Sequence, residues 1–313
     1  MKMKELFDRG EFVVSAEVGP PKGIHVDELV EEAKTYLKGV HAVNVTDNQS
    51  SVMRLGSLAM CKVLKDAGMD PIFQLACRDR NRIALESDLL SAAMLGIENI
   101  LCLTGDHTKM GDHPQAKPVF DLDSVSLLHT VKLLESGVDL GGNELVGEPP
   151  KFSKGAVVSP CSDSVDAQLA KMERKVAAGA DYFQTQAVFE PEKFIKFMEK
   201  AKQYGIAPSR LHIDPLVVTL GTDQIALTVF ADCCRRIKYE YPEIHITSGL
   251  SNISFGLPVR KNINQAFMVL AMNAGMDSAI VDPTNKNMIG MIYATNALLE
   301  RDEYCLEYIG KFG

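Results

Sequence analysis

The sequence predicts an α/β fold, a (β/α)8 barrel, on three observations. Short runs rich in β-branched residues recur along the chain, segments with helical spacing separate them, and neither a GxGxxG motif after the first run nor a GxxxxGKS/T motif occurs. Alternating strands and helices imply parallel strands joined by right-handed crossovers, and nearly continuous apolar strands imply a sheet covered on both faces. A barrel and a doubly wound sheet both satisfy this pattern. Because the two phosphate-binding motifs are missing, we favour the barrel.

Nine runs are predicted to be strands, each bounded by Gly, Pro, Asp or Asn. They lie at 12–18, 42–47, 71–76, 100–104, 156–159, 182–188, 211–217, 244–250 and 278–282. A barrel of this class closes with eight strands, so one C-terminal strand is surplus. We expect the first eight runs to close the barrel and 278–282 to lie outside it.

Two segments between the predicted strands are informative. Ile83, Leu90, Met94 and Ile97 fall on one stripe of a helix that ends at Gly96, and this stripe is predicted to face the sheet. The long segment 106–154 carries one clear helix, 124–135. Long loops that follow barrel strands often carry function, although this one also fits a solvated loop built from turns.

Composition restricts the classes of partner. The 313 residues include 33 Lys and Arg against 41 Asp and Glu, a formal net charge of −8, and no run of basic residues suits nucleic acid. No window reaches the roughly 18 apolar residues of a membrane span, and the N-terminus is polar, so we expect a cytoplasmic protein. The seven cysteines include no CxxC pair, which argues against a disulfide framework or a metal site and predicts reduced, structural thiols such as Cys77 and Cys102.

Polar residues interrupt or end most of the predicted strands, where barrel enzymes place their reacting groups. They are Glu17, Thr46, Asp47, Gln74, Asp106, Gln184, Gln186, Asp214, Asn252 and Asp282. A polar residue in such a place can instead cap the next helix. Glu17 differs because it lies within the apolar run FVVSAEV, where a buried carboxyl group must be paired, protonated or functional. Glu17, Asp106, Gln184, Gln186 and Asn252 together suit a flat heterocycle such as a pterin or a flavin, or else an internal polar layer at the barrel mouth.

Two families are similar to different parts of the chain. Through AEVGPPKG, VTDNQSSVMR, LTGDH and RKVAAGADYFQTQAVF, residues 1–205 resemble the methylenetetrahydrofolate reductase family. Through LHIDPLV, GLSNISFGLPVRKNINQAF and AGMDSAIVDP, residues 206–313 resemble the pterin-binding methyltetrahydrofolate:corrinoid methyltransferases. Both families are TIM-type barrels that bind folate, so the chain looks chimeric, with a join near KAKQYGI.

The reductase resemblance implies roles for residues of the first part. Glu17 matches the acid that acts on a folate nitrogen, Asp106 matches the aspartate that contacts the pterin and tunes the flavin, and Gln186 matches the glutamine that contacts folate and nicotinamide. Thr46 and Lys175 match contacts to flavin adenine dinucleotide (FAD). Further flavin contacts fall on two positions where some reductases carry His and Arg; here they are Gln74 and Thr104.

The methyltransferase resemblance implies a second set. Asp214 matches an aspartate that hydrogen-bonds the pterin, Asn252 matches an asparagine that reaches its N5, and Arg260 lies nearby. The other pterin ligands of that family lie on strands that this chain has replaced. The reductase set is therefore the more complete of the two.

The combined resemblance implies a flavin-dependent oxidoreductase that converts 5,10-methylenetetrahydrofolate to 5-methyltetrahydrofolate in one-carbon metabolism. NADH, NADPH or a redox partner protein would reduce the flavin, and we expect a homo-oligomer. One alternative is a methyltransferase that passes the N5 methyl group to a corrinoid protein. Another is a folate-binding barrel without turnover. A flavin spectrum in the purified protein would favour the first.

Overall fold

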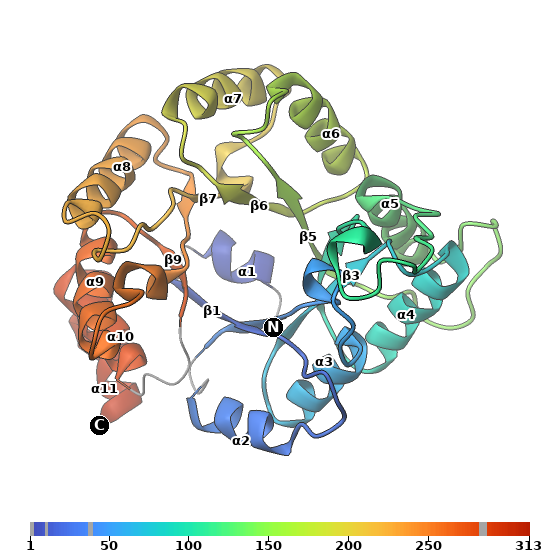
Figure 1. Cartoon of the computed structure of the whole chain (residues 1–313), viewed down its shortest axis with the longest axis horizontal. Coiled ribbons are helices and arrows are strands. Elements are labelled where there is room, and N and C mark those ends of the chain that lie inside the picture. Colours follow the sequence, from blue (N-terminus) through green and yellow to red (C-terminus); the bar gives the residue numbers. More distant parts are fainter. Residues whose placement is uncertain (1–2, 10–11, 37–39, 282–286) are drawn as a thin grey trace.

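Nine parallel strands form one sheet that curls into a barrel (Figure 1). The computed structural model describes residues 3–9, 12–36, 40–281 and 287–313. The strands are β1 (Val13–Val18), β2 (Ala42–Val45), β3 (Pro71–Ala76), β4 (Asn99–Leu103), β5 (Ser153–Val158), β6 (Tyr182–Ala187), β7 (Leu211–Asp214), β8 (His245–Ile246) and β9 (Ser278–Ile280). Strands β1 to β8 lie side by side in chain order, and β9 lies beyond β1. The TIM-type α/β barrel predicted from the alternating pattern is confirmed.

The last strand closes the barrel, so the expectation that 278–282 lies outside it is wrong. β9 pairs with β1 in the register Val13 with Ser278, and a bridge between Gly249 and Ile280 joins it to the segment after β8. No earlier strand is displaced, and the barrel holds nine strands instead of eight. Each of the nine runs forms a strand. The number of strands in the barrel depends on pairing between segments that are far apart in the sequence. Asp282 lies outside the described residues.

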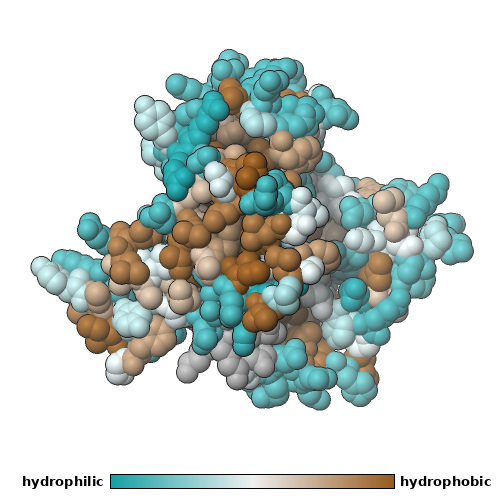
Figure 2. Space-filling model, turned by 60° about the vertical axis from the view of Figure 1, so that its left-hand side comes forward, coloured by the Kyte–Doolittle hydropathy of each residue, from teal (hydrophilic) through white to brown (hydrophobic). Residues whose placement is uncertain are grey.

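Helices cover the outside of the barrel (Figure 1). They are α2 (Asp27–Tyr36), α3 (Ser57–Asp66), α4 (Arg82–Met94), α5 (Ser124–Glu135), α6 (Val165–Ala177), α7 (Pro191–Gln203), α8 (Ala226–Glu240), α9 (Arg260–Asn273), α10 (Met288–Leu298) and the C-terminal α11 (Leu306–Phe312). The predicted helix 124–135 is confirmed, and Asp123 caps it by accepting hydrogen bonds from Val125 N and Ser126 N. On the side formed by α8 to α11, Figure 2 shows apolar side chains at the surface.

The buried face of α4 is not the predicted one. Ile83 and Met94 are 74% and 76% exposed, whereas Leu85, Leu89 and Ala92 are buried. The buried residues are spaced i, i+4 and i+7, which is also an apolar stripe. The helix offers two apolar stripes, and its docking on the sheet selects the one that is buried.

The short helix α1 (Met3–Asp8) lies inside the barrel at the N-terminal ends of the strands (Figure 1). Met3 and Leu6 pack against an inward-facing layer of buried side chains, and Met3 N donates a hydrogen bond of 2.8 Å to Asn99 Oδ1. That layer comprises Val13, Ala42, Ile72, Leu101 and Tyr182. Because successive strand residues alternate between the two faces, the residues two and four positions further along each strand also point inward.

Two stacked histidines lie beside this plug. The ring centroids of His212 and His245 are 4.7 Å apart, and the Phe7 ring lies 4.0 Å from that of His212. Burial, and secondarily the neighbouring His245, lowers the pKa of His212 to about 3, and its Nε2 has no hydrogen-bond partner. His245 Nδ1 lies 3.3 Å from Asp277 Oδ2. His212 is therefore neutral in the folded protein at neutral pH.

This buried imidazole predicts acid sensitivity. As the pH falls through about 6.5, the unfolded chain binds a proton at His212 that the folded protein does not bind until about pH 3. Stability is therefore lost as the pH falls below about 6.5. Urea unfolding at pH 7.5 and pH 5 should show that the wild type loses up to about 2 kcal/mol more than His212→Gln between these pH values. Because His245, Asp277 and Lys238 are present in both proteins, the difference between the two profiles reports on His212 alone.

The matched control is His129→Gln, because His129 is exposed on α5. It should follow the wild-type profile. Parallel pH profiles for the wild type and His212→Gln would contradict the assigned burial of a neutral imidazole.

Candidate functional site

Polar side chains gather inside the barrel at the C-terminal ends of the strands, opposite α1. By the alternation of strand residues, Glu17, Thr46 and Gln186 follow the inward-facing layer by four positions. Gln74 and Gln184 form part of the level beneath, together with Ser15 and Asn44, and most of this level lines a small internal cavity. The predicted site residues of β1, β2, β3 and β6 are thus brought to one end of the barrel, which we call the mouth.

Glu17 presents its carboxyl group at the mouth. It stands near the end of β1, paired with Asn44 of β2 in the strand register. The Glu17 side chain is exposed to solvent at the mouth, so it is not the buried carboxyl group expected from the sequence. Partial desolvation by the surrounding protein still raises the pKa of Glu17 above its ordinary value. This carboxyl group forms no hydrogen bond or ion pair with the described part of the chain. It can therefore hold a proton and offer it to a bound molecule.

Thr46 follows β2 and is only 2% exposed. Its Oγ1 is buried without a hydrogen-bond partner. A buried hydroxyl group of this kind costs free energy until something pairs with it, so it marks a place where a ligand atom would be stabilised. Asp47, the next residue, is committed to structure: its carboxylate pairs with Arg80 at 2.7 Å and accepts Ala76 N at 2.9 Å.

Arg78 connects two loops of the mouth through hydrogen bonds. It was not among the site residues predicted from the sequence. Its buried guanidinium group donates to Ser51 Oγ at 3.1 Å and to the Asn48 carbonyl at 3.3 Å, in the loop after β2. It also lies 3.4 Å from the carbonyl of Asp106, in the loop after β4, and Asp79 neutralises it at 2.6 Å. The side chain of Asp106 is exposed, so these backbone bonds fix its position. The signal in the sequence is the charged run CRDRNR directly after a strand.

Two predicted flavin contacts lie away from the mouth. Lys175 on α6 is 6% exposed, its Nζ donates to the Val157 carbonyl at 2.6 Å, and burial lowers its pKa to about 8. It lies behind the barrel wall and not among the mouth residues. Thr104 is tied to the start of α5, where its Oγ1 donates to Ser124 Oγ and accepts Ser124 N, both at 3.2 Å.

Residues of the second part of the chain complete the mouth. Asp214 at the end of β7 points inward, two positions after His212, and its Oδ1 accepts Ser248 Oγ at 2.6 Å and Leu216 N at 3.0 Å. Burial raises the pKa of Asp214. Asn252 is exposed in the short helix η4 (Leu250–Ser254).

Arg260, the first residue of α9, is committed to its own loop. It binds Ser254 Oγ at 3.0 Å and the Ser251 carbonyl at 2.7 Å. Its guanidinium carbon lies 5.9 Å from the centre of the Phe255 ring. The structure therefore brings Asp214 to the inward face of the barrel and leaves Asn252 and Arg260 on the rim.

The donor set at the mouth fits a flat heterocycle. Glu17 and Asp214 supply carboxyl groups, while Gln74, Gln184 and Gln186 supply amides that both donate and accept. The unpaired Thr46 hydroxyl suits the polar edge of such a ring. In the described ranges no group of three or more His, Cys, Asp or Glu side chains is placed to hold a metal ion, and no helix there is long and apolar enough to cross a membrane.

The fold and the mouth define a parallel-barrel protein with a candidate ligand site at the C-terminal ends of the strands. The chain belongs to the methylenetetrahydrofolate reductase family, whose family model matches residues 2–222. The resemblance to that family proposed from the sequence motifs is confirmed, and the family match extends past the join expected near residue 205.

Relatives come from both families named by the motifs. A methylcorrinoid:tetrahydrofolate methyltransferase of Eubacterium limosum is 51% identical over 115 residues, which is 37% of this chain and 42% of that protein. A 5,10-methylenetetrahydrofolate reductase of Pectobacterium carotovorum is 27% identical over 201 residues, 63% of this chain and 62% of that protein. These matches span less than two thirds of the length of either relative.

One solved structure supports the fold. An uncharacterized protein from Clostridium thermocellum, described as binding two copies of 5-methyl-5,6,7,8-tetrahydrofolic acid, superposes with a TM-score of 0.53 at 14% identity. The match covers 87% of this chain and 98% of that one. At this identity the likeness concerns the barrel alone.

The role of Arg78 can be tested without any substrate. Arg78→Met removes donors to the loops after β2 and β4, so backbone amides of 48–54 and 105–110 should exchange with solvent about 10-fold faster or more, as expected from losing a charge-assisted hydrogen bond. Hydrogen exchange followed by mass spectrometry measures this. In the control Arg82→Met, which removes the ion pair of a half-exposed side chain with Asp121, both loops should exchange as in the wild type. Unchanged exchange in Arg78→Met would refute the assignment.

Proposed function

We propose that the protein reduces 5,10-methylenetetrahydrofolate to 5-methyltetrahydrofolate with FAD as its cofactor. The observation that carries the proposal is a carboxyl group, Glu17, with a raised pKa at the mouth of a barrel that belongs to this family. The neighbouring amides and the unpaired Thr46 hydroxyl supply polar contacts for two flat rings. NADH, NADPH or a redox partner protein is the electron donor.

The residues present fit the ring end of FAD better than its phosphate end. Thr46 and Gln74 would hold the flavin ring, because one has an unpaired buried hydroxyl group and the other an inward-facing amide. Lys175 would have to leave the Val157 carbonyl to reach a phosphate. The chemistry that FAD supplies when bound is transfer of a hydride to the bridging carbon of the folate.

The chain's own residues act on the folate. Glu17 holds a proton and donates it to N10, which opens the bridge between the two nitrogens and leaves the carbon ready to be reduced. Asp106 and Gln186 orient the pterin, Asp106 through its exposed carboxylate and Gln186 through its amide. Arg78 acts as a positioning residue, because it holds the backbone that carries Asp106.

Replacing Glu17 tests the acid role. Glu17→Gln keeps the shape and removes the proton, so folate turnover should fall about 100-fold or more, in line with general-acid contributions, while flavin binding and flavin reduction by the donor stay near wild type. In the wild type, turnover should also fall as the pH rises through the raised pKa of Glu17, since the acid form is lost. Stopped-flow measurement separates the two half-reactions.

The control is Glu28→Gln, at an exposed position in α2. It should leave both half-reactions unchanged. If Glu17 served only to stabilise the fold, Glu17→Gln would lower the melting temperature and leave folate turnover per folded molecule unaltered, and equal folate rates would sink the acid role.

A second candidate function is transfer of the N5 methyl group of methyltetrahydrofolate to a corrinoid protein. Two observations favour it: the 51% identity with a methylcorrinoid:tetrahydrofolate methyltransferase, and the inward-facing Asp214 held by Ser248. In this function Asp214 would bind the pterin, with Asn252 and Arg260 at the rim. The reaction needs no flavin, and a corrinoid protein would be the partner.

Asp214→Asn separates the two functions. If the chain is a methyltransferase, this change removes a carboxylate that accepts the pterin N–H groups and should lower methyl transfer to cob(I)alamin about 10-fold or more, a loss expected for a charge-assisted hydrogen bond. A protein that purifies with a flavin spectrum and shows no methyl transfer would rule this function out. Ser251→Ala, on the rim, serves as the control.

The division into a reductase-like part, 1–205, and a pterin-binding part, 206–313, is proposed as a statement about sequence origin only. In the fold both parts share one sheet, because β6 pairs with β7 across the join, with Phe183 opposite Leu211. The homo-oligomeric state and the cytoplasmic location stay predictions.

A further inference from the structure

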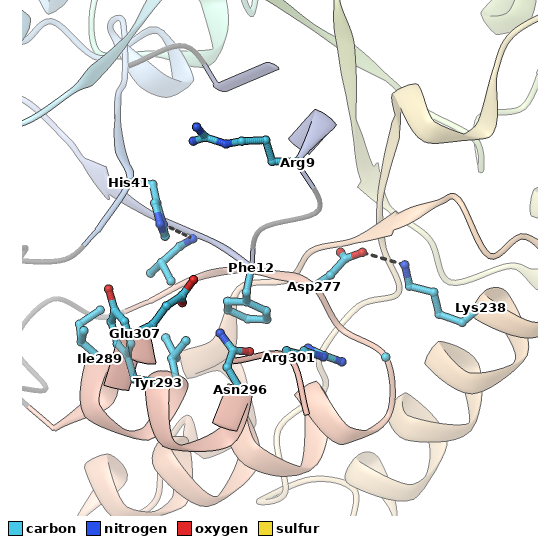
Figure 3. A pocket seen from close by; sticks show the side chains of 13 residues that line it. Arg9, Phe12, His41, Lys238, Asp277, Ile289, Tyr293, Asn296, Arg301 and Glu307 are labelled. Atoms are coloured by element: carbon cyan, nitrogen blue, oxygen red, sulfur yellow. Dashed lines mark hydrogen bonds and ion pairs between the residues drawn. The ribbon is translucent and has the colours of Figure 1, made fainter. Parts of the chain in front are cut away.

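A second cavity lies on the outside of the barrel, at the end opposite the mouth (Figure 3). Its volume is about 550 Å³. The start of β1, the turn before β9 and the helices α10 and α11 form its walls, and Phe12, Asp277 and Asn296 are among the lining residues. The cavity is of the size that holds small-molecule ligands. It is separated from the mouth by the barrel and its plug, so the folate chemistry does not use it.

One part of the lining is apolar and aromatic. Phe12 and Ile292 are buried and Tyr293 lies beside them on α10. Figure 3 shows the Phe12 ring, just before β1, directed toward α10 and lying near Asn296, while Arg301 follows the end of that helix. A flat apolar body would therefore contact a ring and an aliphatic side chain.

Arg301 brings a positive charge to the same wall. Its Nη2 donates to the Met272 carbonyl at 3.2 Å, and in the described chain no carboxylate forms an ion pair with it. The nearby Asp277 is already engaged by Lys238 at 2.7 Å and by the Ile246 N–H at 2.7 Å. Arg301 is exposed, and partial desolvation lowers its pKa while the nearby Asp277 opposes this shift. An anion at this point would pair with a guanidinium group that no carboxylate already neutralises.

Asn296 offers a ligand a second polar contact. Its Oδ1 is buried and has no hydrogen-bond donor. An N–H or O–H group of a ligand beside Arg301 would satisfy it. Elsewhere on the wall Glu307 makes no ion pair in the described residues, and Arg9 also lines the cavity.

We propose that this cavity is a second ligand site that binds a small aromatic carboxylate carrying an N–H donor. The carboxylate pairs with Arg301, the N–H group donates to Asn296 Oδ1, and the ring lies against Phe12. Because the cavity touches both β1 and the approach to β9, such a ligand binds at the seam that closes the barrel.

The probe is anthranilate, which has the ring, the carboxylate and the N–H donor and is itself fluorescent. Fluorescence titration of the full chain should show saturable binding. Benzoate lacks the donor and aniline lacks the charge, so both should bind more weakly. Inorganic phosphate has no ring to lie against Phe12, so it should compete with anthranilate only weakly.

Variants assign the binding to this cavity. Arg301→Met should weaken anthranilate binding about 10-fold or more, and Arg301→Lys should restore part of it, since the charge returns without the fork of donors. Asn296→Leu should abolish the preference for anthranilate over benzoate while benzoate binding stays within about 3-fold. A melting curve for each variant confirms that it is folded.

Matched control variants exclude binding of anthranilate at other sites on the protein. Arg235→Met removes an exposed arginine on α8, and Asp214→Asn alters the mouth; neither should change anthranilate binding. Absence of saturable binding to the wild type, equal binding by the wild type, Arg301→Met and Asn296→Leu, or loss of binding in Asp214→Asn would each overturn the proposal. None of these outcomes depends on whether the protein reduces folate.

Discussion

The pairing of β9 with β1 determines the shape on which the other features depend. The register Val13 with Ser278 places β9 between β1 and β8, so the sheet closes with nine strands. The diameter of a barrel grows with its strand number, and eight strands leave an interior that side chains alone can fill. A ninth strand leaves room for α1, whose Met3 and Leu6 fill the N-terminal end.

The closed barrel divides its interior into an apolar end and a polar end. Near α1, Phe7 packs on the neutral His212, and burial there excludes charge. At the mouth the inward positions carry carboxyl and amide groups. Partial desolvation raises the pKa of the exposed Glu17, and burial raises that of Asp214. A ligand that enters the mouth meets groups that can hold protons, with an apolar plug beneath them.

Residues from both parts of the chain meet at that mouth. Glu17 and Gln186 come from the reductase-like part and Asp214 from the methyltransferase-like part, yet the three lie on inward-facing positions of one sheet. A shared barrel therefore explains how segments similar to two families bring polar residues to the same end of one sheet. The two proposed functions differ in whether Glu17 or Asp214 would act on a folate, and the same scaffold would present either.

The sequence by itself determined the local elements and which polar residues lie at the strand ends. Periodicity and turn residues located nine strands and the helix 124–135, and the rule that barrels react at their strand ends singled out Glu17, Gln186 and Asp214. Those signals lie within a few residues along the chain, so they can be recognised locally. Lys175 and Thr104 matched family motifs, but the structure places Lys175 on the Val157 carbonyl and Thr104 at the start of α5.

Only the tertiary structure decided the strand count, the buried face of α4, the plug formed by α1 and the part played by Arg78. Each depends on contacts between segments far apart in sequence: β9 with β1, Met3 with Asn99, and Arg78 with Asn48 and Asp106. The sequence shows which residues can make such contacts. Which of the competing contacts form is set by how the whole chain packs, because each apolar stripe and each charged group has more than one partner until the barrel closes.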